Sequence, residues 1–137
     1  MERTRLTHIA APEGVTPGAG YSHVVMGSGR WVALSGQVAL DERGEVVGAG
    51  DPLAQARQVF ENLRRCLAAA GATFDDVVKL TFYVTDTAFL PAVREARDAY
   101  VDVERPPAST AVQVAALFRP KLLLEVEAFA VLPEVAG

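Results

Sequence analysis

The sequence predicts an α+β domain in which two helices cover one face of a single sheet. Apolar residues alternate in several short runs, and in two longer segments they recur at three- and four-residue steps. These segments follow the order strands, helix, strand, helix, strands, which is typical of an α+β layer. The length of 137 residues suits one domain, and 50% apolar with 22% charged residues is the balance of a globular chain.

The first part of the chain predicts a short strand, a loop and a hairpin. The stretch that ends near Tyr21 is rich in proline and glycine, which favour loops. Two β-type runs, residues 23–26 and 31–34, flank Gly27-Ser28-Gly29-Arg30, and glycine supplies the positive φ of a tight turn. We expect Ser35-Gly36-Gln37 to continue the second strand through a bend at Gly36.

The first helix has both of its ends marked in the sequence. Asp51 is a good N-cap, Pro52 suits the first helical position, and Gly71 follows the last periodic residue. The apolar residues between them form one stripe, which packs on the sheet. Its members are Leu53, Ala56, Phe60, Leu63, Leu67 and Ala70.

The second half of the chain predicts a strand, a helix and two closing strands. Residues 77–84 alternate as a strand, and residues 89–103 follow a helical period that Pro106 and Pro107 stop. Residues 110–116 and 122–132 form the closing strands. The side chains expected to face the core are Val78, Leu80, Phe82 and Val84 in the strand and Val93, Ala96, Ala99, Tyr100 and Val103 in the helix.

The last strand is apolar on both faces. Leu122 to Ala130 alternate toward one face, while Leu123, Phe129 and Val131 point to the other. Because two helices cover only one face of the sheet, a second copy of the chain is the simplest cover for the other. Glu125 and Glu127 share that second face, where an unpaired buried carboxylate is costly. Two readings stay open: a charge at the rim of an oligomer, or a functional acid or base.

Composition and motifs exclude several classes of protein. A net charge of −4 with scattered basic residues argues against a nucleic-acid partner. No apolar stretch is long enough to span a membrane or to serve as a signal peptide, so we expect a cytoplasmic protein. His8 and His23 lack metal-ligand spacing, and Cys66 beside the helix stripe indicates a half-buried core residue, so no metal site is expected.

An ordered set of segments resembles the Rid (YjgF, reactive intermediate deaminase) family. The resemblance runs from about Tyr21 to Leu132, and its strength lies in the order and spacing of the pieces. These pieces are Gly20-Tyr21-Ser22, Ser35-Gly36-Gln37, Gln55 through Asn62-Leu63, Gly71, Asp76-Val77-Val78-Lys79, Pro107-Ala108-Ser109-Thr110 and Glu125-Val126-Glu127-Ala128.

The resemblance implies a fold, an assembly and a chemistry. It implies that residues 1–137 form one domain of chorismate-mutase-like fold, and that three copies form a homotrimer with a central β-barrel and clefts between subunits. Archetypal members of the family hydrolyse 2-imino or 2-enamino acids to 2-keto acids and ammonia without a cofactor. The resemblance therefore implies a small-molecule ligand and no cofactor.

The resemblance also implies a set of site residues. Glu125 would orient the attacking water, and Tyr21, Ser35, Gly36, Ser109 and Thr110 would line the cleft. In the family an arginine that pairs with the substrate carboxylate occupies the position of Ser109, and Ala111 stands where a cysteine is frequent. A serine cannot make a two-pronged charged contact, so the archetypal deaminase activity is expected to be weak. Arg105 and Arg119 are the nearby arginines that could supply the charge.

Two functions of different classes follow. The first is hydrolysis of an imine, enamine or related reactive intermediate other than the archetypal 2-imino acid, with Glu125 as the base that orients water. The second is a non-catalytic trimer that binds a ligand or protects a partner. Ribonuclease activity, a label that this family sometimes carries, is disfavoured by the acidic charge balance.

Overall fold

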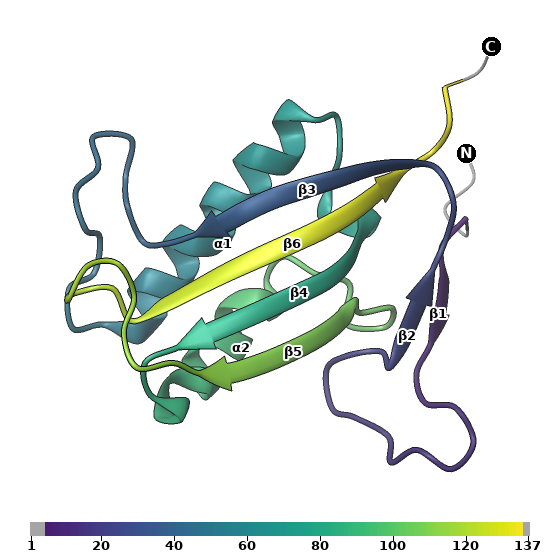
Figure 1. Cartoon of the computed structure of the whole chain (residues 1–137), viewed down its shortest axis with the longest axis horizontal. Helices are drawn as coiled ribbons and strands as arrows, with labels where there is room; N and C mark the ends of the chain where they lie inside the picture. Colours follow the sequence, from purple (N-terminus) through teal and green to yellow (C-terminus); the bar gives the residue numbers. More distant parts are fainter. Residues whose placement is uncertain (1–4, 136–137) are drawn as a thin grey trace.

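A computed structural model describes residues 5–135, and its strands form a small and a large sheet (Figure 1). The small sheet pairs β1 (Thr7–Ile9) with β2 (Val24–Met26) in antiparallel fashion. The large sheet has the order β3-β6-β4-β5 and is antiparallel except for the β4–β5 pair. Its strands are β3 (Arg30–Gln37), β6 (Leu124–Leu132), β4 (Val77–Val84) and β5 (Ala108–Gln113).

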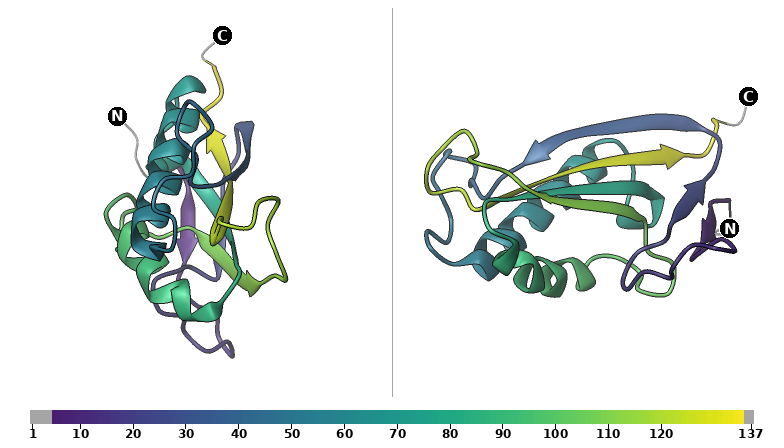
Figure 2. Two further views of the ribbon diagram at one scale, coloured as in Figure 1. Left: turned by 90° about the vertical axis from the view of Figure 1, so that its left-hand side faces the viewer. Right: turned by 60° about the horizontal axis from the view of Figure 1, so that its bottom comes forward.

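Both helices, α1 (Pro52–Ala69) and α2 (Leu90–Asp98), lie on the same face of the large sheet (Figure 2). Single 3-10 turns, η1 (Phe74–Asp76) and η2 (Thr87–Phe89), precede β4 and α2. This arrangement confirms the predicted α+β class with two helices on one face. The cap is also confirmed, since Asp51 Oδ1 accepts a hydrogen bond from the Ala54 amide at 3.1 Å.

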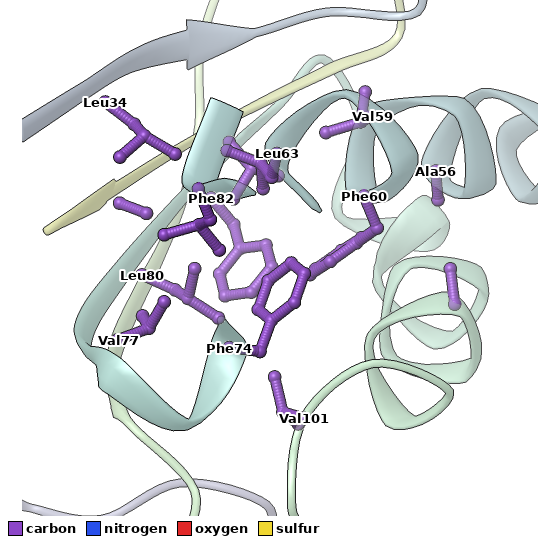
Figure 3. Packing of buried hydrophobic residues seen from close by; sticks show 14 of the residues in the cluster. Leu34, Ala56, Val59, Phe60, Leu63, Phe74, Val77, Leu80, Phe82 and Val101 are labelled. Carbon is purple, nitrogen blue, oxygen red and sulfur yellow. The ribbon is translucent and has the colours of Figure 1, made fainter. Parts of the chain in front are cut away.

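An aromatic cluster fills the space between the helices and the sheet (Figure 3). Phe60 of α1 is fully buried and lies between Phe74, Phe82 and Tyr100, at centroid distances of 5.4–6.3 Å within the cluster. Edge and offset contacts at these distances add to the free energy of burial. The helix stripe that the sequence predicts is therefore the face that packs on the sheet, over β3 and β6, except that Ala70 at its end is exposed.

Two amides of α1 hold the loops on either side of the helix. Gln55 is fully buried; its Nε2 donates to the carbonyls of Gly48 and Lys121, and its Oε1 accepts from the Leu123 amide. About two turns further along α1, Asn62 Nδ2 donates to the carbonyls of Val38 and Leu40. These bonds satisfy buried backbone groups and fix where β6 begins beside β3.

The predicted hairpin between residues 23–26 and 31–34 is wrong. β2 pairs with β1, and β3 pairs with β6 from Arg30↔Leu132 onward. Between β2 and β3, Gly29 has a φ of +148°, and a Cβ there would lie 1.9 Å from the Leu132 carbonyl oxygen. The glycines therefore carry the chain closely past the end of β6, and long-range pairing overrides the local turn signal.

Three boundaries also differ from prediction. A register shift between Val77 and Lys79 buries Val77 in place of the predicted Val78. α2 ends at Asp98 rather than at residue 103. The chain then turns, Asp102 Oδ1 accepts from the Glu104 amide in this turn, and Val103 is exposed. β5 and β6 cover residues 108–113 and 124–132, rather than 110–116 and 122–132.

Candidate functional site

The face of the large sheet opposite the helices carries the predicted catalytic glutamate. Glu125 and Glu127 of β6 lie on this face, where the register sets Tyr83 opposite Glu125 and Thr81 opposite Glu127. Tyr83 donates its hydroxyl hydrogen to Glu127 Oε1 at 2.8 Å, and this bond is the main cause of the raised pKa of Tyr83. One of the two carboxylates is thus engaged by a tyrosine of the neighbouring strand.

Glu125 lies against Gly36 of β3. A Cβ at Gly36 would lie 2.0 Å from Glu125 Oε2, so the carboxylate occupies the space that a side chain would take. The pKa of Glu125 is raised, first by burial of the half-buried carboxyl group and then by repulsion from Glu127. A carboxylate with a raised pKa is a stronger base, which suits general acid–base work.

The bend predicted at Gly36 is present as a register shift. The β3–β6 pairing skips between Leu34 and Gln37, and Gln37 Nε2 donates to the Ser35 carbonyl at 3.2 Å. Irregular strand edges of this kind re-aim side chains and backbone groups beside functional sites. Gly36 therefore lies beside Glu125, and Ser35 precedes it on the same strand.

Tyr21 and Ser109 lie on the helix side of the sheet. Ser109 is opposite Leu80 in the β4–β5 register and shares its inward direction. Ser22 holds the loop against β5, since its amide donates to the Pro107 carbonyl and its Oγ to the Pro106 carbonyl. The ring of Tyr21 packs over Gly18, where a Cβ would lie 2.1 Å from Cζ.

Tyr21 and Ser109 border a pocket of about 240 Å³ between α2 and the β4–β5 edge. The pocket combines an apolar floor with hydroxyl and guanidinium groups. Its lining residues are Ala19, Tyr21, Phe82, Leu90, Val93, Arg94, Arg97, Ser109 and Ala111. Thr110 faces the opposite way, and its Oγ1 accepts a hydrogen bond from Lys79 Nζ at 2.8 Å.

Within one chain, the predicted site residues fall into two groups on opposite faces of the sheet. Ser35, Gly36 and Glu125 gather on the face without helices, whereas Tyr21 and Ser109 gather on the other. A single copy therefore does not bring Glu125 to the pocket.

The arginines named from the sequence do not line this pocket. Arg119 Nη1 donates to the Gly44 carbonyl, and Arg105 Nη2 donates to the Leu6 carbonyl. Arg94 and Arg97 of α2 line it instead, and sequence reasoning missed both. Arg97 also lies against Gly20 in the structure, where a Cβ would lie 2.5 Å from Arg97 Nη2, but nothing in the sequence pattern indicates this.

The histidines and the cysteine occupy ordinary positions. Cys66 is half-buried against the core, as predicted. His8 lies in β1, where burial and then Arg105 lower its pKa, and His23 Nε2 contacts the Thr16 carbonyl. Across residues 5–135, no three His, Cys, Asp or Glu side chains cluster as metal ligands, and no helix is long and apolar enough to cross a membrane.

Comparison with known proteins places this geometry in context. Residues 11–132 match the family described as Endoribonuclease L-PSP. Protein DfrA of Myxococcus xanthus is 38% identical, covering 96% of this chain and 97% of its own. The 3-aminoacrylate deaminase RutC of Acinetobacter baylyi is 34% identical over 89% of this chain and 95% of its own. The solved structure of the Rid-family protein YyfB from Yersinia pestis superposes with a TM-score of 0.84 at 40% identity, covering 94% of this chain and 100% of that one.

Proposed function

The chain belongs to the Endoribonuclease L-PSP (YjgF/Rid) family, and on that basis we propose that it hydrolyses an imine, an enamine or a related reactive intermediate to a carbonyl compound and ammonia. The observation that carries the proposal is the Glu125 carboxylate, half-buried, with a raised pKa, and seated against Gly36. The relative whose name specifies deamination of 3-aminoacrylate supports this chemistry, since 3-aminoacrylate is an enamine.

Glu125 acts on water in the proposed reaction. An enamine first becomes its imine as a proton moves from nitrogen to carbon. Water adds to the carbon of the C=N bond while the carboxylate accepts one of its protons, and the protonated Glu125 returns that proton to nitrogen, which gives a carbinolamine. The C–N bond of the carbinolamine then breaks while its hydroxyl proton passes through Glu125 to nitrogen, which releases ammonia and leaves the carbonyl group. The step consumes one water and requires no redox partner, and a positioned carboxylate is the group that it needs.

The site is proposed to form between copies of the chain. The face that carries Glu125 also exposes Trp31, at 72%, beside Phe129 at a centroid distance of 5.9 Å, and such apolar area favours a protein partner. In a homotrimer, Glu125 and Gly36 of one copy can meet Tyr21 and Ser109 of the next. One trimer then holds three such clefts.

The assembly is expected to sediment as a trimer of three 14.6 kDa chains, about 44 kDa. The physical reason is that one copy does not bring the two groups of site residues together. One copy also leaves the apolar face opposite the helices uncovered. Analytical ultracentrifugation at micromolar concentration measures the mass directly. A stable monomer would contradict both the assembly and the shared cleft.

Replacing Ser109 with arginine is expected to change the preferred substrate. A serine hydroxyl offers one neutral donor from β5, so the wild-type protein should hydrolyse 2-imino acids slowly and bind 2-keto acids more weakly than the arginine variant does. Ser109→Arg should raise the affinity for 2-oxobutanoate about tenfold, which corresponds to 1.4 kcal/mol. Calorimetric titration measures the affinity, and ammonia release from 2-iminobutanoate measures the rate. Rapid hydrolysis by the wild-type protein would show that Ser109 does not limit this activity.

Cleavage of RNA is a weaker reading of the family's description. The net charge of −4 offers little attraction to a phosphate backbone. In addition, the pocket of about 240 Å³ suits a small molecule better than a nucleotide chain.

A further inference from the structure

Arg97 is a buried cation at the wall of the pocket. Its exposed fraction is only 7%, although arginine is among the residues least often buried. The loop before β2 is shaped around it, because Gly20 has a φ of +81° and a Cβ there would lie 2.5 Å from Arg97 Nη2. A side chain at residue 20 would therefore collide with the guanidinium group in its buried position.

The charge around the pocket is positive. Nε and Nη2 of Arg97 both donate to Asp98 Oδ1, at 3.0 and 2.8 Å, and the Asp98 side chain is 44% exposed. A guanidinium carries five N–H donors, so these two bonds leave donors for a ligand. Arg94 lines the same pocket, and no residue in its lining is acidic. Two guanidinium groups thus line the pocket, and the carboxylate that pairs with Arg97 is partly exposed and lies outside the lining.

The remaining lining limits the size and shape of the ligand. Tyr21 and Ser109 offer hydroxyl groups at one side, while Phe82, Leu90 and Val93 offer apolar surface. A pocket of about 240 Å³ that combines a guanidinium cation, apolar surface and neutral donors matches a small organic carboxylate.

We propose that Arg97, from α2, binds the carboxylate of the ligand in this pocket and so supplies from the helix side the charge that Ser109 does not supply from the strand. This inference rests on the proposed function and deepens it by naming the residue that binds the substrate carboxylate.

The test uses two probes of the same shape, butanoate and butanamide, which differ in charge. Titration calorimetry on the wild-type protein should show butanoate binding at least tenfold more tightly than butanamide. Arg97→Met keeps much of the stem volume and should abolish that preference. Arg119→Met, which removes an exposed arginine bonded to the Gly44 carbonyl, should leave it unchanged. An unchanged preference in Arg97→Met would overturn the proposal.

A second variant covers the case in which Arg97→Met does not fold. Asp98 is partly exposed and competes with a ligand for Arg97. Asp98→Asn should therefore raise the affinity for butanoate threefold or more and leave that for butanamide unchanged. Equal or weaker binding of butanoate would count against the proposal.

Failure of this inference is distinguishable from failure of the proposed function, because neither probe contains a C=N bond. If Arg97→Met loses the butanoate preference while Glu125→Gln keeps full turnover, carboxylate binding by Arg97 stands and hydrolysis through Glu125 is wrong. If Arg97→Met keeps the preference while Glu125→Gln is inactive, hydrolysis stands and the role of Arg97 is overturned.

Discussion

Glu125→Gln is expected to lower the turnover of an accepted imine or enamine by about 10²–10⁴-fold. The amide keeps the shape of the side chain beside Gly36, but it cannot accept a proton from water. The mass of the assembly and its unfolding temperature should stay the same, since within residues 5–135 the Glu125 carboxylate forms no hydrogen bond or ion pair that holds the sheet together. Ammonia release measured at matched protein concentration gives the rate. Unchanged turnover would return Glu125 to a structural role at the subunit boundary and favour a non-catalytic binding protein.

Glu127→Gln is the matched control for this variant and also changes the pH profile. The glutamine can still accept the Tyr83 hydroxyl hydrogen, so the loss of turnover should be much smaller. Burial, and then Glu127, raise the pKa of Glu125, so wild-type turnover should fall on acidification at a higher pH than an ordinary glutamate would give. Glu127→Gln removes the repulsion and should move this acidic limb to lower pH. A limb that does not move would show that Glu125 is not the titrating base.

Gly36→Ala is expected to reduce turnover about 10²-fold, which is the cost of displacing a reacting group by about 1 Å. The added methyl group would lie 2.0 Å from Glu125 Oε2, so the carboxylate must move. Gly36 does not have a positive φ, so its backbone accepts alanine without strain. The variant should therefore keep its unfolding temperature while it loses activity.

Ala33→Ser serves as the control on the same strand, since Ala33 lies opposite Phe129 and away from Glu125. It should retain wild-type turnover. Full activity in Gly36→Ala would show that the position of the Glu125 carboxylate beside β3 is not the one used in the reaction.

The parts of the fold that depend on local chemistry could be predicted from the sequence. Asp51, Pro52 and Gly71 mark the ends of α1, because a cap, a fixed φ and a left-handed position each demand particular residues. The alternation along β6 likewise predicted which side chains face the helices and which face outward, since side chains in a strand point to opposite faces in turn.

The parts of the fold that depend on long-range contacts could not be predicted from the sequence. Residues 23–26 and 31–34 carry a sound local turn signal, yet each run pairs with a strand elsewhere in the sequence. Arg97 was missed for the same reason: a helical arginine gives no sign in the sequence that it is buried, and its burial depends on packing against the loop that contains Gly20. The division of the site between two faces follows from the β4–β5 register, in which Ser109 points inward and Thr110 outward.

The place of β6 in the middle of the large sheet has a consequence for how the chain is made. β6 is hydrogen-bonded to β3 on one side and to β4 on the other, and the ribosome synthesises it after both. At about 5–20 residues per second, the nascent chain holds β3 and β4 for seconds without the strand that joins them. During that interval the backbone edges of both strands are open to other nascent chains or to a chaperone. Co-translational folding of this sheet therefore waits for its final strand, and the pairing of Arg30 with Leu132 closes one of its longest loops.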